Sequence, residues 1–369
     1  MSLPDAAPPT SPEGKRLESL PPVEAPTASF ILQLFLIPLA IVSIVVLLWL
    51  SFSWLAHMGR DNPDDLVKAL QRGDDSSWQR AYELADLLRS PDPKYDALRR
   101  DTKLAGELAA FLGRDLDVKI EGSGDKVRIM RRMFLCRALG SFALLDGLPV
   151  LMRAAKQESH PLEVEVRIAA LESITTLADS VGPQTLAENA ELMKLLLAAS
   201  RERSEDDPAP AAVDGNEPSA FRPHAEVRAV AAFALGVIGS DEAIARLRQM
   251  LHDPYANARY NAATGLARRG DAACLPVLKE MLDPDNNQAA KDEKYADEQD
   301  RKRATVLLNG IRAALIFAQS NPDADLSGLK QSLKTLAQSP LEQIESGRIQ
   351  LQSTAVEALR LMEKERKAD

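Results

Sequence analysis

The side chains with the clearest capacity for chemistry in this 369-residue sequence form a short basic group. Its members are Lys126, Arg128, Arg131, Arg132 and Arg137. On a helix, Arg128, Arg131 and Arg132 project to one side, because steps of three and four residues keep the same face. The group predicts a docking patch for an acidic partner or for lipid headgroups. The alternative is a solvated face, or ion-pair partners within the fold.

The other reactive residue types show no spacing that predicts a site. Glu121–Lys126 looks like a phosphate loop but lacks the GxxxxGK[ST] pattern, so we expect a turn. Cys136 and Cys274 are far apart and are expected to be small buried hydrophobic residues. The histidines are dispersed, with no metal-ligand spacing: His57, His160, His224 and His252. We therefore expect no catalytic residue, no metal and no cofactor, and hence no enzyme.

The composition sets the class of protein. A net charge of −9 argues against general nucleic-acid binding, which needs basic surface to displace counterions. Aromatic residues make up only 5% of the chain, and Ala and Leu dominate, as in layers of packed helices. An all-α fold follows.

A repeat explains how these helices are organised. Between Ala225 and Leu282, Val227-Arg228 aligns with Ala258-Arg259 thirty-one residues later, and Gly239 aligns with Gly270. Each unit reads as two short amphipathic helices joined by a tight turn. Paired alanines at 231–232 and 262–263 would let the next helix approach closely. Such a unit cannot cover its own apolar face, so neighbouring units must stack.

The unit resembles a HEAT repeat, in the short bacterial form also found in phycobilisome lyases. The resemblance rests on "EVRAVAAFALGVIGSDEAIARLRQMLHD" and "NARYNAATGLARRGDAACLPVLKEMLD". It implies an armadillo-like α-solenoid of HEAT-like helical hairpins over residues 57–369. It also implies a ladder in which an acid precedes a basic residue by six positions. Asp253 with Arg259 and Asp74 with Arg80 match this pattern, whereas Arg228 and Arg167 lack the acid.

The repeat phase extends along the chain. Arginines at the equivalent position are Arg132, Arg167, Arg228 and Arg259. The wide gap between the second and third of them contains an acidic, Pro-rich insertion at about 202–223, and a second polar insertion covers about 283–298.

The N-terminal part has a different character. Residues 1–28 are rich in Pro and predict a disordered tail. Residues 29–56 predict a transmembrane helix, with residues 30–52 in contact with lipid, because the apolar run is long enough to cross a bilayer. Trp49, Phe52 and Trp54 are the expected membrane-interface residues. A cleaved signal peptide is the competing interpretation, with a poor cleavage site after the apolar run.

Together these features predict a single-pass membrane protein whose repeats bind a protein partner as a scaffold or adaptor, without catalysis. Basic residues just after the span favour a cytoplasmic repeat domain. The alternative function is chromophore attachment to other proteins, as in phycobilisome lyases, or another enzyme-accessory role.

Overall fold

The predicted all-helical fold is confirmed for the residues that the structure, a computed structural model, describes: 28–57, 68, 76–202, 223–291, 293–341, 344 and 347–365. No strand occurs in these ranges. Their α-helices are α1 (Ala28–His57), α3 (Ser77–Arg89), α4 (Thr102–Leu116), α5 (Lys126–Gly140), α6 (Leu148–Ala154), α7 (Glu163–Val181), α8 (Pro183–Ala187), α9 (Ala190–Ala199), α10 (Pro223–Ile238), α11 (Asp241–Met250), α12 (Ala256–Ala267), α13 (Leu275–Met281), α14 (Ala296–Ser320), α15 (Ser327–Gln338) and α16 (Arg348–Glu365).

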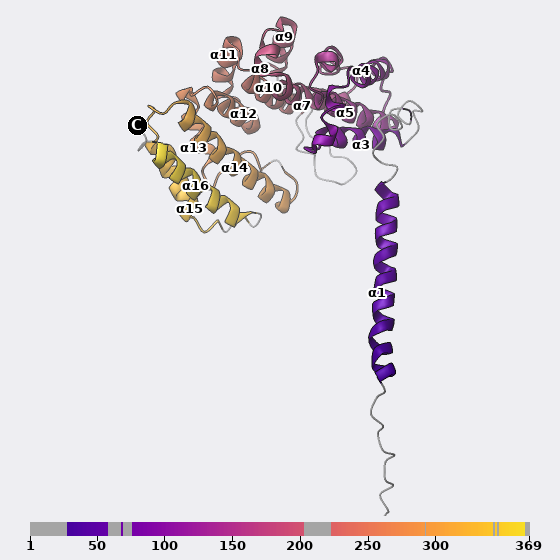
Figure 1. Ribbon diagram of the computed structural model, residues 1–369. Coiled ribbons are helices and arrows are strands. Elements are labelled where there is room, and N and C mark those ends of the chain that lie inside the picture. The colour runs from indigo at the N-terminus through magenta and orange to yellow at the C-terminus, as the bar shows by residue number, and fades with distance from the viewer. Residues whose placement is uncertain are drawn as a thin grey trace, which may run out of the picture. The chain divides into compact units, whose positions relative to one another are not determined.

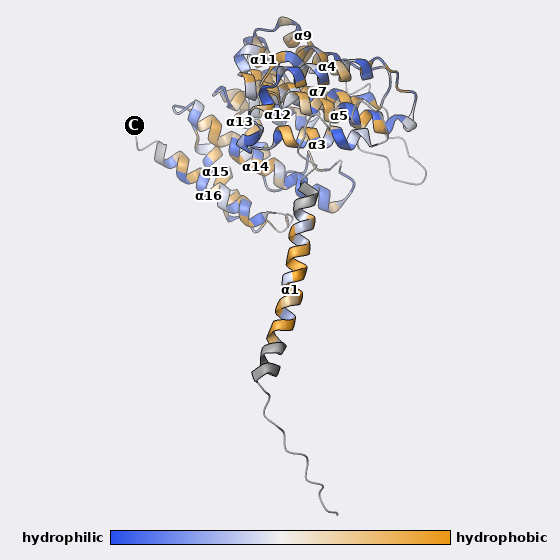
Figure 2. Cartoon of the chain, turned by 45° about the vertical axis from the view of Figure 1, so that its right-hand side comes forward, coloured by the Kyte–Doolittle hydropathy of each residue, from blue (hydrophilic) through white to orange (hydrophobic). Residues whose placement is uncertain are grey.

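Helix α1 belongs to one compact unit, residues 1–62, and the other helices to a second, residues 63–369. The described part of α1 is mostly apolar on the side seen in Figure 2, and α1 contains no Asp, Glu, Lys or Arg. Its segment Phe35–Ser53 is long and apolar enough to cross a membrane, a test that a signal sequence also passes. Trp49 and Phe52 are 67% and 68% exposed. Trp54 lies in α1, but its side chain is outside the described residues, as is the predicted tail before Ala28.

The helices after residue 76 form two layers (Figure 1). We call α3, α5, α7, α10, α12 and α14 the inner layer, and in it each helix packs against the next. The outer layer contains α4, α6, α9, α11 and α13, which connect successive inner helices and pack on them, and α15, which follows α14 and packs on α13. Helix α16 packs on α14 and α15. This arrangement follows from the repeat, because each hairpin exposes an apolar face that only its neighbours cover.

The turn within the repeat forms as its residues predict. Gly239 and Gly270 have φ of 72° and 64°, a left-handed conformation that glycine adopts without steric cost and that ends a helix. After the first of these turns, the Ser240 hydroxyl accepts a hydrogen bond from the Ala243 amide at 3.2 Å and caps α11.

Small residues set the spacing between α10 and α12. A Cβ on Gly236 would lie 2.7 Å from the Cα of Gly265, so the two helix backbones touch at this point. The paired alanines at 231–232 and 262–263, expected to let the next helix approach closely, are buried completely.

The structure describes most of the second predicted insertion but little of the first. Residues 203–222 lie outside the described residues. In the second insertion, α14 begins at Ala296, before the expected end of the insertion at about residue 298. Asp297 and Glu298 occupy the first turn of α14, where the positive end of the helix dipole stabilises acids. The charged end of this segment is therefore helical.

Candidate functional site

The two arginines at the centre of the predicted patch are buried within the fold. Arg131 donates from Nε and Nη2 to the two carboxylate oxygens of Asp115, each at 3.0 Å, and from Nη1 to the Ser77 hydroxyl at 2.9 Å. Arg132 is 0% exposed and donates to Glu163 Oε1 at 3.2 Å. Burial lowers the pKa of Arg132, against the opposing effect of Asp115 and Glu163. The prediction of an exposed docking patch is therefore wrong for both residues.

The remaining members of the basic group point to different places. Lys126 is exposed, and Arg128 Nη1 lies 3.2 Å from Asp125 at the turn before α5. Arg137 lies over the ring of Phe134, with 5.3 Å between its guanidinium carbon and the ring centre. Because α5 packs between α3 and α7, its basic residues are divided between internal ion pairs and the inner surface, and the group does not form one patch.

The arginines that the repeat alignment places in phase share one geometry. Each lies in the first half of an inner helix and donates to backbone carbonyls at the end of the preceding outer segment. The acceptors are Asp115 and Val118 for Arg132, Ala155 for Arg167, Glu202 for Arg228, and Asp253 and Pro254 for Arg259. The last carbonyls of a helix have no partner within it, so each arginine satisfies groups that would otherwise lack one.

Each of these arginines also pairs with an acid, and two of the pairs correct the prediction. Arg228 binds both carboxylate oxygens of Asp253, at 2.9 and 3.0 Å. Arg259 reaches only the backbone oxygen of Asp253, at 2.8 Å, and its Nη2 lies 2.6 Å from Glu280 Oε1. The expected pair of Asp253 with Arg259 is thus replaced by a pair with Arg228.

The ladder therefore continues where the six-residue pattern is absent. Arg167 pairs with Glu202, and Arg228 with Asp253, both through acids that come later in the chain. At the other expected rung, Asp74 lies outside the described residues, and Arg80 pairs with Glu83 of its own helix at 2.9 Å.

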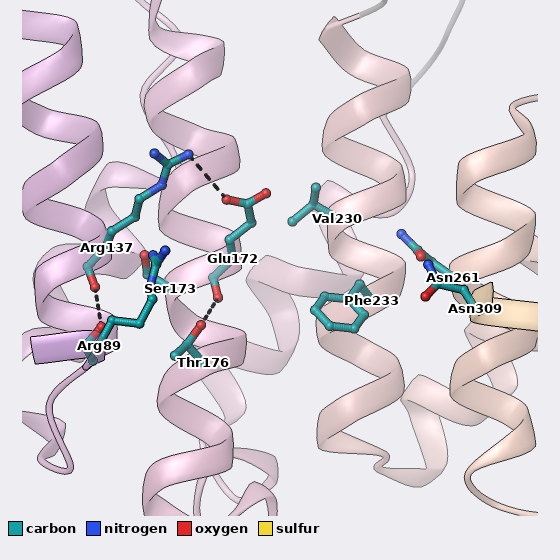
Figure 3. A pocket seen from close by; sticks show the side chains of 10 residues that line it. Arg89, Arg137, Glu172, Ser173, Thr176, Val230, Phe233, Asn261 and Asn309 are labelled. Carbon is teal, nitrogen blue, oxygen red and sulfur yellow. Dashed lines mark hydrogen bonds and ion pairs between the residues drawn. The ribbon is translucent and has the colours of Figure 1, made fainter. Parts of the chain in front are cut away.

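The inner layer encloses a hollow, which we call the central hollow. Its volume is about 460 Å³, and every helix of the inner layer contributes to its lining (Figure 3). The lining residues are Arg89, Arg137, Ser141, Glu172, Ser173, Thr176, Val230, Phe233, Asn261 and Asn309. A structure built from stacked hairpins has in this way brought residues more than 200 positions apart to one cavity.

A second hollow of about 510 Å³ adjoins the first, and we call it the distal hollow. Val230, Phe233, Asn261 and Asn309 line both. The distal hollow adds side chains from α10, α12 and α14, which include Glu226, Tyr260, Thr264, Arg268, Lys302, Thr305 and Arg312. Because the two hollows share these four lining residues, we refer to them together as the groove.

The charged groups of the groove are partly desolvated. Burial raises the pKa of Glu172, while the nearby Arg137 and Arg89 oppose this effect. The closest approach of Arg137 to Glu172 is 3.9 Å, which is too long for a hydrogen bond. Burial also lowers the pKa of Arg268, whose guanidinium lies 5.7 Å from the centre of the Phe233 ring. These side chains can offer charge and hydrogen bonds to a ligand, but they form no acid–base pair.

An aromatic cluster adjoins the central hollow. Trp78 stacks on Phe134 with 6.2 Å between ring centres, and Tyr82 meets Phe134 edge-on at 5.2 Å. Tyr82 is half exposed, and Arg137 links the cluster to the hollow because it lies on Phe134 and lines the cavity. Aromatic and Arg side chains of this kind are enriched where proteins bind one another.

The other candidate groups are placed as follows. Cys136 and Cys274 are buried and free, as expected, and burial raises the pKa of each thiol to about 12. Among the described residues, no cluster of His, Cys, Asp and Glu could hold a metal ion. His224 Nδ1 lies 2.9 Å from Glu202 Oε2, and His252 is exposed.

Comparison with known families identifies part of this architecture. Residues 219–293, which contain α10 to α13, match the family model for HEAT repeats. This part of the chain is therefore similar to HEAT repeats. No curated protein matches the sequence. The match covers the two units whose internal similarity the sequence shows most clearly, and the remaining hairpins pack in the same two layers.

The lining of the groove was missed in the sequence, although the phase of the aligned arginines contains the signal for it. Arg137, Glu172, Phe233 and Thr264 each follow a ladder arginine by five residues. The positions two and nine residues after those arginines supply further lining residues, among them Val230, Asn261, Ser141, Thr176 and Arg268. Steps of three and four residues place these positions on one helix face, opposite the alanines that face the outer layer.

Proposed function

We propose that this protein is a scaffold or adaptor whose repeats form an α-solenoid and whose groove binds a segment of a partner protein. The observation that carries the proposal is the central hollow, because all helices of the inner layer contribute side chains to it. Stacked helical repeats present such extended concave surfaces for binding. The proposal assigns no catalysis to the groove.

The groove has the chemistry of a protein-binding surface more than that of a small-molecule pocket. Its polar lining of Arg, Asn, Glu and Thr side chains surrounds only a small apolar centre at Val230 and Phe233. Small-molecule sites are mostly apolar, with few polar groups. An extended polypeptide, by contrast, presents many backbone and side-chain groups that such a lining can bind.

Site-specific photo-crosslinking in the source cell tests this function. A photoreactive residue at Thr176 or Asn309, both exposed in the groove, should crosslink to a distinct protein. The same residue at Gln249, which is exposed on the outer helix α11, serves as the control and should give no such product. Equal crosslinking from both surfaces would contradict the groove as the binding site.

We further propose that α1 anchors the protein in a membrane, with the repeats on the cytoplasmic side. The length and apolar surface of Phe35–Ser53 support this. Extraction of membranes with alkaline carbonate should leave the intact chain in the membrane fraction. A soluble chain that begins after residue 57 would instead identify a cleaved signal sequence. Chromophore attachment stays a prediction, which incubation of the purified protein with a bilin would test.

A further inference from the structure

The groove is basic although the chain is acidic. Its charged lining residues are Arg89, Arg137, Arg268, Lys302 and Arg312 on the positive side, and Glu172 and Glu226 on the negative side. The net charge of the lining is thus opposite in sign to the −9 of the whole chain. Self-repulsion among these cations costs folding free energy, and a ligand of opposite charge would relieve it.

Several of these cations have hydrogen-bonding capacity left. Among the described residues, Arg89 and Arg312 make no ion pair. Arg268 Nη1 is buried and has no hydrogen-bond partner, and its side chain is held against the ring of Phe233. An unpaired buried guanidinium N–H costs free energy that a carboxylate oxygen would recover.

Amide side chains between these cations fit a polypeptide backbone. Asn261 Nδ2 donates to the carbonyl of Ala229 at 2.8 Å, which orients the amide and leaves its Oδ1 without a hydrogen bond among the described residues. Asn309 is exposed, lines both hollows and makes no side-chain hydrogen bond within the described part of the chain. An amide offers both a donor and an acceptor, as the backbone of an extended segment does.

The centre of the groove is apolar. Val230 and Phe233 are half-buried and lie between the side chains of Arg89 and Arg137 and those of Asn261 and Asn309 (Figure 3). Both also line the distal hollow, which contains the other basic side chains of the groove. A ligand that covers both basic regions must therefore place an uncharged group over Phe233. The negative charge of Glu172 next to this centre also disfavours a continuous run of acids.

We propose that the groove binds an extended acidic segment of a partner protein, with acids on both sides of an apolar residue. One set of carboxylates pairs with Arg89 and Arg137 and the other with Arg268 and Arg312, while the apolar side chain contacts Phe233. This inference rests on the proposed function and names the chemistry of the partner. Nucleic acid fits less well, because Glu172 and Glu226 interrupt the basic lining and a phosphate chain needs continuous basic surface.

Fluorescence anisotropy on the full chain in detergent tests the proposal. The probe is a labelled peptide with three glutamates on each side of a phenylalanine, and matched peptides carry lysine or glutamine in place of glutamate. We expect the acidic peptide to bind at least tenfold more tightly than either matched peptide. Its affinity should fall with added salt, because the groove arginines are partly exposed to solvent.

Charge reversal locates the binding. In the variant Arg89→Glu with Arg312→Glu, the acidic peptide should bind at least tenfold more weakly, since two attractions become repulsions. The matched control reverses Arg248 on α11 and Arg360 on α16, which are exposed arginines outside the groove, and should bind as the wild type does. Circular dichroism confirms that each variant is folded.

Four results would overturn the proposal. The first two are equal binding of the acidic and lysine peptides, and an equal loss of affinity in the control variant. The third is tighter binding of single-stranded DNA than of the acidic peptide. The fourth is binding of the acidic peptide only after residues 203–222 are replaced by a neutral linker. The last result would identify the chain's own acidic insertion as the occupant. If the photo-crosslink from Thr176 forms while the acidic peptide fails to bind, the proposed function stands and only the acidic chemistry of the partner is rejected.

Discussion

Removal of one ladder arginine should open the repeats locally. The substitution Arg228→Ala leaves the carboxylate of Asp253 without its two hydrogen bonds from Nε and Nη2. It also removes the donor to the Glu202 carbonyl at 2.9 Å. The side chains of Arg228 and Asp253 are only 5% and 8% exposed, so water cannot replace these bonds without a change in packing.

The expected cost follows from this burial. Removal of one partner of a buried ion pair costs about 3–5 kcal/mol, because the other charge stays buried without its partner. The lower end of this range applies here, because the Tyr255 amide still donates to Asp253 Oδ1 at 2.9 Å. A loss of about 3 kcal/mol raises a local opening equilibrium by roughly two orders of magnitude. For comparison, Arg301 and Asp297 are 60% and 69% exposed, and Arg301→Ala should cost under about 1 kcal/mol.

Hydrogen exchange measured by mass spectrometry on the full chain is the appropriate assay, because stacked repeats can open one at a time. Amides of α10, α11 and the start of α12 should exchange faster in Arg228→Ala, while α3 and α4 change little. The double variant Arg228→Met with Asp253→Leu should lose less stability than Arg228→Ala alone, because it leaves no buried charge. Equal losses in the two variants would refute this reasoning, and so would unchanged exchange in Arg228→Ala.

Three further perturbations have clear expected outcomes. Gly236→Ala should destabilise the repeats by about 1–3 kcal/mol in urea titrations, because its Cβ would lie 2.7 Å from the Cα of Gly265. As a control, Gly106→Ala should be neutral or stabilising, because no atom lies within 4 Å of the added Cβ. Burial raises the pKa of Cys136 and of Cys274 to about 12, so both thiols should resist iodoacetamide at neutral pH until urea unfolds the chain. Rapid labelling of the native protein, measured by mass spectrometry, would show instead that the thiols are accessible. Because burial raises the pKa of Glu172, its negative charge lowers the stability of the fold above that pKa, and this effect disappears as the pH falls towards the usual value of 4.5. Urea titrations should therefore find Glu172→Gln at least as stable as the wild type at neutral pH, and the difference in stability should shrink as the pH falls to 4.5. A variant that is less stable than the wild type at neutral pH would contradict the raised pKa.

Much of the fold can be read from the sequence, because helical repeats have local and periodic signals. The apolar spacing around Leu235 and Leu266 and the glycines at 239 and 270 place the helices and turns within a few residues. The arginine phase also survives in the structure, since Arg132, Arg167, Arg228 and Arg259 share one geometry. Each of these features depends on residues in one hairpin or its neighbour.

Partner choice within the ladder depends on the tertiary structure. The sequence shows that Asp253 precedes Arg259 by six residues, yet the carboxylate binds Arg228, which lies 25 residues before it. The packing of α11 against α10 decides which guanidinium reaches the acid, and a spacing rule contains no information about this. The same holds for Arg131 and Arg132, which look like a surface patch in the sequence and are buried against Asp115 and Glu163.

The sequence by itself determined the helical class, the repeat and the phase of its arginines, because hydrophobic period and turn residues act over a few positions. The tertiary structure alone decided that Arg89 of α3 and Asn309 of α14 line one cavity. The physical reason is that each inner helix packs on the next from α3 to α14, and this series of contacts sets which distant side chains meet.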